Sequence, residues 1–138
     1  MIALTDQPIE PRRAELLAGV TCPGAGAIVT FEGIVRAESH GKRVTHLYYE
    51  AFPEMALPEM EKIEAEARKR WPLQALVLVH RTGRVETGET SVLIGVASGH
   101  RAEAFEACRF VIDSVKTTVP IWKREHYTDG AVWIEDHA

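Results

Sequence analysis

Cysteine, long apolar runs and an excess of either charge are all scarce in this sequence. The two cysteines, Cys22 and Cys108, lie far apart in no metal-ligand spacing, so we expect reduced thiols. The amino terminus has no basic segment followed by an apolar one, which argues against a secretory leader. No apolar run approaches the roughly 20 residues needed to cross a bilayer. These absences predict a cytoplasmic protein with no membrane partner.

The charge balance gives no sign of a large anionic partner. Sixteen basic and 20 acidic residues leave a net charge of −4. Such a chain has no overall attraction to nucleic acid, so any anion site must be local. With 138 residues and 46% hydrophobic content, the chain is long enough for one core and too short for two ordinary domains. We therefore expect a single domain over residues 1–138.

The apolar residues change spacing along the chain, from the period of strands to that of helices. Helices are expected at residues 12–17, at 55–71 and from Arg101 until shortly before Pro120. Strands are expected at 2–5, 27–35, 44–51, 76–79 and 91–97, with a closing hairpin of 121–127 and 131–134. Residues 37–43 are expected as an exposed loop and 83–88 as a turn region. Because strands outnumber helices and do not alternate regularly with them, the predicted class is α+β, with a mixed or antiparallel sheet and packed helices.

A first candidate site is the sequence Ser98-Gly99-His100-Arg101, where a strand meets the start of a helix. Unpaired N–H groups at a helix start, together with Arg101 and His100, could bind a phosphate. An arginine at a helix start is also common as a solvated side chain, and the helix dipole slightly disfavours it there. By itself this motif leaves both interpretations open.

Lys116 and Lys123 form a second candidate, on either side of Pro120. They could converge if the chain folds back after the proline, and the apolar surroundings could make an amine usable in catalysis. A lysine near a helix carboxyl end is otherwise only a favourable partner of the helix dipole. Arg36, which follows an apolar strand, is a third candidate, and it could equally mark where that strand meets water.

No metal site and no cofactor are predicted. His46, His80 and His126 have no ligand spacing among themselves, and Cys108 falls on the core face of its helix, where packing is its expected role.

Five ordered blocks of this sequence resemble the molybdopterin synthase catalytic subunit family. They are GAIVTFEGIVR at 26–36, YEAF at 49–52 followed by Met55, HRTG at 80–83, SGHR at 98–101 with Ala104 and Phe105, and DSVK at 113–116 with PIWKRE at 120–125. The similarity extends over residues 25–134 and keeps both order and spacing.

The resemblance implies a sulfurtransferase of molybdenum cofactor biosynthesis and a hammerhead-type α+β domain. Sulfur would pass from the thiocarboxylated carboxyl terminus of a small ubiquitin-like carrier, ending in Gly-Gly, to cyclic pyranopterin monophosphate, forming the molybdopterin dithiolene. It also implies a homodimer within a heterotetramer, with one carrier at each end.

The resemblance implies roles for individual residues as well. Lys116 is similar to the essential lysine near the carrier's tail, and Lys123 to the second catalytic lysine. His100 and Arg101 are similar to an anion-binding pair presented by the neighbouring protomer. The substrate-binding set it implies is Ile34, Val35, Arg36, His100, Arg101, Lys116, Lys123, Arg124 and Glu125.

Two other classes of protein would carry the same cations. One is a non-catalytic dimeric module that docks the carboxyl-terminal tail of a partner protein and uses its lysines only as counter-charges. The other is an enzyme that acts on a different phosphorylated small molecule through an imine on Lys116. Sulfur transfer to the pterin would distinguish the proposed enzyme from both.

Overall fold

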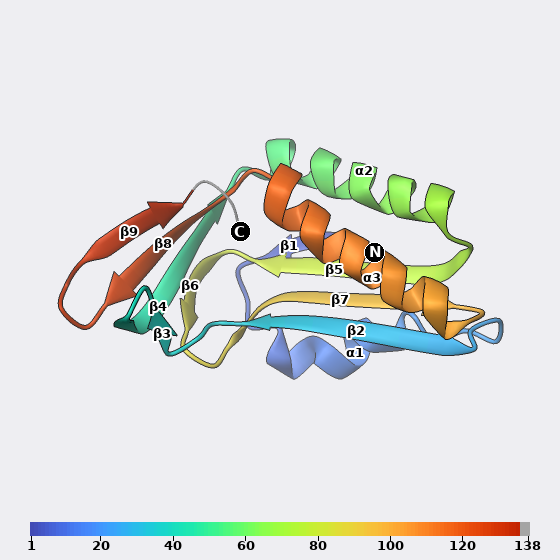
Figure 1. Cartoon of the computed structure of the whole chain (residues 1–138), viewed down its shortest axis with the longest axis horizontal. Helices are drawn as coiled ribbons and strands as arrows, with labels where there is room; N and C mark the ends of the chain where they lie inside the picture. The colour runs from blue at the N-terminus through green and yellow to red at the C-terminus, as the bar shows by residue number, and fades with distance from the viewer. Residues whose placement is uncertain (136–138) are drawn as a thin grey trace.

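Two sheets meet end to end, and two long helices cover one face of the first sheet (Figure 1). The computed structural model describes residues 1–135, so the last three residues of the expected domain, 136–138, lie outside the described part. The first sheet has the strand order β1 (Ile2–Thr5), β5 (Leu73–Arg81), β7 (Thr90–Ser98) and β2 (Ala27–Ile34). β1 runs parallel to β5, and the other neighbours are antiparallel.

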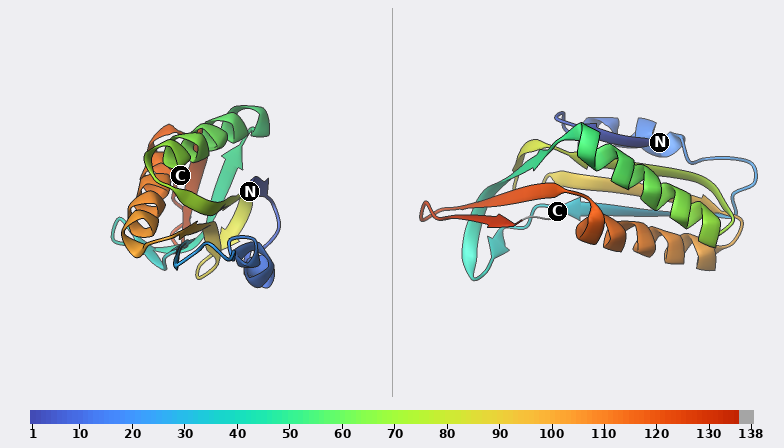
Figure 2. Two further views of the ribbon diagram at one scale, coloured as in Figure 1. Left: turned by 90° about the vertical axis from the view of Figure 1, so that its right-hand side faces the viewer. Right: turned by 90° about the horizontal axis from the view of Figure 1, so that it is seen from above.

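Both faces of this first sheet are covered. The helices α2 (Pro53–Arg70) and α3 (Arg101–Thr118) lie on one face, and the short α1 (Arg13–Ala18), entered through a 3-10 turn at Glu10–Arg12, lies on the other (Figure 2). β7 is buried along its whole length. Its alternate residues Ile94 and Val96 join the core beneath α2 and α3, whereas Leu93 and Ala97 pack with Leu16 of α1. Burial on both faces explains why this strand is an almost continuous apolar run.

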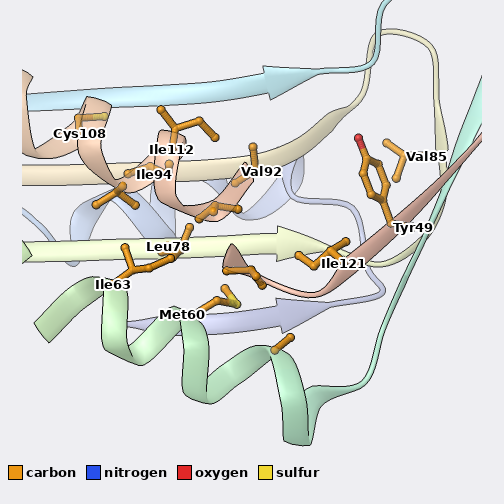
Figure 3. Close-up of a cluster of buried hydrophobic side chains, with 14 of the residues drawn as sticks. Tyr49, Met60, Ile63, Leu78, Val85, Val92, Ile94, Cys108, Ile112 and Ile121 are labelled. Atoms are coloured by element: carbon orange, nitrogen blue, oxygen red, sulfur yellow. The ribbon is translucent and has the colours of Figure 1, made fainter. Parts of the chain in front are cut away.

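The second sheet has the order β3 (Glu38–Ser39), β4 (Lys42–Ala51), β8 (Ile121–Tyr127) and β9 (Val132–Glu135), and β6 (Gly83–Glu86) also pairs with β4. Its residues Leu47, Tyr49 and Ile121 belong to the same buried cluster as the residues of α2 and α3 (Figure 3). The core therefore continues from one sheet into the other without interruption.

The α+β class, with mixed and antiparallel sheets and packed helices, is confirmed. The two long predicted helices are present, and α2 begins two residues earlier than expected because Pro53 fits the first turn of a helix. No helix within residues 1–135 is both long and apolar enough to cross a membrane.

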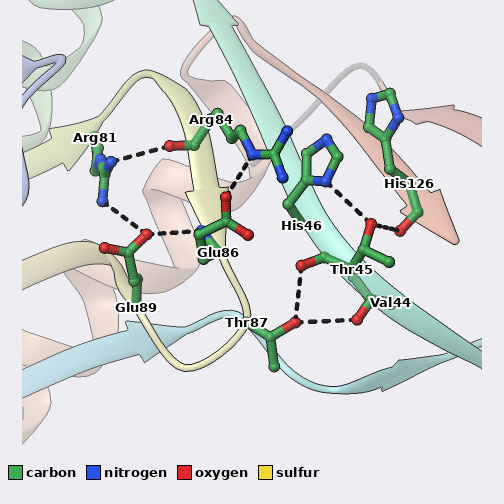
Figure 4. A network of polar contacts seen from close by, with 9 residues as sticks. All are labelled: Val44, Thr45, His46, Arg81, Arg84, Glu86, Thr87, Glu89 and His126. Atoms are coloured by element: carbon green, nitrogen blue, oxygen red, sulfur yellow. Dashed lines mark hydrogen bonds and ion pairs between the residues drawn. The ribbon is translucent and has the colours of Figure 1, made fainter. Parts of the chain in front are cut away.

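Two sequence predictions about loops were wrong in part, since residues 37–43 are exposed as expected, apart from the half-buried Ser39, but contain strands. Residues 37–43 contain a tight hairpin, because His40 and Gly41 both adopt positive φ and form a two-residue turn between β3 and β4. Residues 83–88 contain β6, which pairs with β4 over His46–Tyr49. Its pairing is reinforced by the Thr87 hydroxyl, which donates to the Val44 carbonyl at 3.0 Å (Figure 4). The partner strand of β6 lies about 40 residues earlier in the chain, so no local pattern could indicate this pairing.

Candidate active site

A cavity of about 310 Å³ lies where the two sheets meet, against the last turns of α3. Segments from six strands and one helix form its wall. The residues that line it are Phe31, Glu32, Gly33, Ile34, Val35, Arg36, Glu38, Ser39, Val44, Leu47, Tyr49, His80, Ser91, Val92, Ile112, Val115, Lys116, Lys123 and Glu125. Its apolar lining residues continue the core, and its positively charged side chains come from three different segments of the chain.

Lys116 and Lys123 both reach this cavity, so the convergence suggested by the sequence is confirmed. Lys116 lies in the last turn of α3. Val119 then leaves the helical conformation, as expected for a residue before proline, and Pro120 leads the chain into β8. The helix end and the proline thus turn the chain back, and they bring two amines seven positions apart to one wall.

Glu125 is a buried carboxylate beside Lys123. Its Oε1 lies 3.8 Å from the Lys123 Nζ, and its Oε2 accepts a hydrogen bond of 2.5 Å from the Tyr127 hydroxyl. Burial acts to raise the pKa of Glu125, but hydrogen bonds from Tyr127 and Ser39 and the charge of Lys123 outweigh it and lower that pKa. Glu125 is therefore ionised at neutral pH and forms an ion pair with the Lys123 ammonium group.

Three of the predicted substrate-binding residues line the cavity from the end of β2. The register between β2 and β7 shifts between Gly33 and Ile34. Beyond this bulge Ile34, Val35 and Arg36 border the cavity, Val35 buried and Arg36 exposed. A bulge at a strand end re-aims the following side chains, which explains why Arg36 turns toward the cavity.

His100 and Arg101 lie at the opposite end of α3 from Lys116, and both are exposed. Fifteen residues of helix at 1.5 Å per residue separate Arg101 from Lys116, a distance of roughly 22 Å. The position of this helix start is fixed by a close contact with the loop before β2, since a Cβ at Gly26 would lie 2.2 Å from the Gly99 carbonyl oxygen. Within one chain, these two residues are not brought to the cavity.

Arg124 also lies outside the cavity, because neighbouring residues of a strand point to opposite faces. Its guanidinium lies 4.7 Å from the ring centre of Tyr48. Together with Glu50, Phe52 and Trp122 it borders a separate, shallower hollow on the other face of the second sheet. On that same face His46 and His126 stack, with ring centres 4.3 Å apart.

Tyr49 and His80 are two of the cavity residues that the sequence analysis did not assign to the site. His80 is 1% exposed, and burial, assisted by the nearby charge of Lys116, lowers its pKa to about 4 against the opposing effect of a hydrogen bond to the Arg81 carbonyl. Because Leu76, Leu78 and His80 alternate along one face of β5, a histidine in an apolar strand was the available signal. The sequence analysis named His80 in the block at 80–83 and noted that it lacks metal-ligand spacing, but gave it no role in the site. Among residues 1–135 no group of three or more histidine, cysteine or acidic side chains could hold a metal ion.

The low pKa of His80 has a measurable effect on acid stability. Between pH 6.5 and pH 4 an unfolded chain would bind a proton at this histidine and the folded one would not, so acid favours unfolding. We expect this histidine alone to lower the free energy of unfolding by on the order of 3 kcal/mol at pH 4, and to leave it unchanged above pH 7. Urea unfolding at pH 7 and pH 4 should show that His80→Phe loses less stability on acidification than the wild type. His100→Ala, which changes an exposed histidine, serves as the control and should behave as the wild type. Equal losses in all three proteins would contradict a buried neutral His80.

Comparison with known proteins agrees with this arrangement. The family model described as MoaE protein matches residues 4–118. The chain is 44% identical to a molybdopterin synthase catalytic subunit of Pyrococcus abyssi, over 97% of this chain and 90% of the relative. It superposes on the crystal structure of molybdopterin synthase from Staphylococcus aureus with a TM-score of 0.90 at 32% identity, covering 97% of this chain and 96% of the other.

A more distant structure shares the fold. It is a protein–protein complex of subunits 1 and 2 of molybdopterin-converting factor from Helicobacter pylori, with a TM-score of 0.71 at 22% identity, covering 93% of this chain and 86% of the other. The family model and the relatives that match over nearly the whole length lead to one conclusion: this chain belongs to the molybdopterin synthase catalytic subunit family, the MoaE proteins.

Proposed function

We propose that this protein is a cytoplasmic sulfurtransferase that converts cyclic pyranopterin monophosphate into molybdopterin. The sulfur comes from the thiocarboxylated terminal glycine of a small ubiquitin-like carrier. The observation that carries the proposal is the cavity itself, in which Lys116, Lys123 and Arg36 converge on an apolar floor between the two sheets. The thiocarboxylate and the cyclic phosphate are both anions, so cations in a partly desolvated cavity suit both reactants.

The chemistry needs no nucleophile from this chain. A thiocarboxylate is already a good sulfur nucleophile, so the main tasks of the enzyme are to hold the reactants together and to manage charge. After sulfur has bonded to the substrate, water must add at the carrier's carbonyl carbon to break the acyl–sulfur bond and release an ordinary carboxylate. That addition creates an oxyanion, which the Lys116 ammonium can stabilise. Cys108 takes no part, since burial raises the pKa of its thiol to about 11.

The carrier's role rests on the cations of the cavity and on a relative. A Gly-Gly tail has no side chains, so its anionic end can approach Lys116 closely. The related Helicobacter pylori protein is described as a complex of two subunits. We propose that this chain likewise binds a small carrier subunit, and that it does so as a homodimer with one carrier at each end.

The proposed homodimer would allow His100 and Arg101 to reach the cavity of the partner chain, although they are far from the cavity of their own chain. β2 is an edge of the first sheet among the described strands, and apolar side chains are exposed on β2 and on the adjacent α3, at Ile28 (44%), Ile34 (46%) and Phe105 (61%). The start of β2 lies beside the His100 segment, through the pair Ala27 and Ser98, and its end borders the cavity. Antiparallel pairing of β2 with its copy would place the start of one strand beside the end of the other. Each cavity would then receive the anion-binding pair of the partner, beside its own Arg36.

Reconstitution tests the proposed reaction directly. We expect the purified protein, mixed with thiocarboxylated carrier and cyclic pyranopterin monophosphate, to form molybdopterin, detected as its fluorescent oxidation product. Two matched carriers serve as controls: one that ends in an ordinary carboxylate should bind without reacting, and one that lacks its Gly-Gly end should bind weakly.

If the protein is a docking module, the opposite result of the reconstitution is expected. Such a protein would bind the thiocarboxylated carrier through its tail and yield no dithiolene with any substrate. Tight carrier binding without sulfur transfer, in a protein of intact fold, would therefore reject the enzyme and favour the module.

A further inference from the structure

His80 is a buried histidine to which the proposed reaction gives no role. It lies at the carboxyl end of β5, on the face that is covered by the helices, and it forms part of the cavity wall together with Lys116. Its ring and that of Tyr49 form a T-shaped pair, with ring centres 5.0 Å apart and an angle of 73° between the planes. Its ring is therefore held on several sides and cannot turn freely.

One hydrogen bond determines which ring nitrogen carries the proton. The His80 Nδ1 lies 2.8 Å from the carbonyl oxygen of Arg81, and a carbonyl oxygen can only accept. Nδ1 must therefore be the protonated nitrogen. In a neutral imidazole the other nitrogen, Nε2, then has a free lone pair and is an acceptor.

The ring stays neutral under physiological conditions, since the pKa of His80 is lowered to about 4. Burial is the main cause, and the charge of Lys116, which lines the same cavity, contributes in the same direction. A neutral acceptor beside an ammonium group can take a hydrogen bond from it without taking its proton.

Arg81, whose carbonyl accepts the hydrogen bond from His80, is held by contacts of its own side chain. Arg81 is nearly buried; its Nη2 donates to the Arg84 carbonyl at 3.0 Å, and its Nη1 lies 3.3 Å from the Glu89 carboxylate (Figure 4). This ties the end of β5 to the segment that contains β6. The Arg81 carbonyl, and with it the orientation of the His80 ring, is thus fixed by contacts outside the cavity.

We propose that His80 is a positioning residue for Lys116: its unprotonated Nε2 is the acceptor that holds the Lys116 ammonium group at the carrier's terminal carbonyl during sulfur transfer. The inference rests on the proposed function and assigns a further residue to it. One N–H of the ammonium group is directed to His80, and the ammonium charge faces the oxyanion. A lysine is flexible, so a fixed acceptor reduces the entropy lost when the amine is placed for reaction.

Two amide variants separate the two ring nitrogens. In His80→Asn the amide lies near the position of Nδ1, so the bond to the Arg81 carbonyl can be kept while the acceptor toward the cavity is lost. In His80→Gln the longer side chain carries an amide oxygen to the position of Nε2, which restores an acceptor. We expect His80→Asn to lower kcat by about 10-fold to 100-fold, the range for one hydrogen bond to a charged group, with little change in KM for either reactant. His80→Gln should recover most of that loss.

A second measurement needs neither activity nor a variant at position 80. Nitrogen-15 NMR of the imidazoles in the full-length wild type should show His80 as the neutral Nδ1–H form from pH 6 to pH 8. Its Nε2 signal should shift in Lys116→Ala and not in Arg109→Ala, a change at an exposed position of the same helix.

The possible results separate the two claims. An Nε2–H form of His80, or equal losses of kcat in the Asn and Gln variants, would overturn the positioning role. If the wild type forms no molybdopterin at all, the proposed function fails, and the NMR result still decides whether His80 is the acceptor for Lys116.

Discussion

Lys116→Ala should lower the rate of molybdopterin formation by about 100-fold or more, the usual cost of removing one group that stabilises a developing oxyanion. The fold should survive, because Lys116 is exposed in the last turn of α3 and is not among the buried residues of that helix. Single-turnover rates with thiocarboxylated carrier and pyranopterin, together with thermal unfolding, measure both parts of this expectation.

Arg109→Ala is the matched control for this substitution. Arg109 lies two turns earlier on the same helix, its side chain is 85% exposed, and it does not line the cavity. It should react at the rate of the wild type. If a folded Lys116→Ala protein has near-normal turnover, Lys116 has no role in the reaction, whatever the behaviour of the control.

Mixing two inactive variants should restore activity. Lys116→Ala and Arg101→Ala each disable every site of their own homodimers if each site combines Lys116 of one chain with Arg101 of the other. In a mixed dimer one site receives both defects and the other receives neither. Random exchange makes half of the dimers mixed, so the mixture should recover roughly a quarter of the wild-type rate.

This test separates a shared site from a site contained within one chain. Unfolding and refolding the two variants together ensures exchange, and the same treatment of each variant alone provides the baseline. If the mixture is no more active than the two variants alone, although mixed dimers are detected by mass spectrometry, the partner does not supply Arg101.

The sequence predicted the elements that local spacing determines. The helices α2 and α3 were found because their apolar residues recur on one helical face, and this face is the buried one in the structure apart from Phe105, which is exposed. β6 was missed because its short sequence begins with Gly83, which looks like a turn, and because its stability comes from β4. Pairing between distant segments leaves little trace in either segment alone.

Prediction of the site residues was limited in the same way, because the site depends on contacts between distant segments. Lys116 and Lys123 could be placed together because Pro120 lies between them and forces the chain to turn. Arg124 could not be excluded from the cavity, because its direction depends on the register of β8 against β4. His80 resembles an ordinary core residue in sequence, and only the cavity at which the ends of β5 and α3 meet brings it near a lysine.

The place of β8 in the second sheet has a consequence for synthesis of the chain on the ribosome. β4 can acquire β3 and β6 on one side early, but its other side pairs with Ile121–Tyr127, which emerges about 75 residues later. Until then the nascent chain presents an open strand edge beside the unfinished core, the kind of surface that promotes association between chains. Emergence of β8 closes this edge and, in the same step, delivers Lys123 and Glu125 to the cavity. Pairing of β8 with β4 therefore protects the chain from aggregation and completes the cavity at the same late stage of its synthesis.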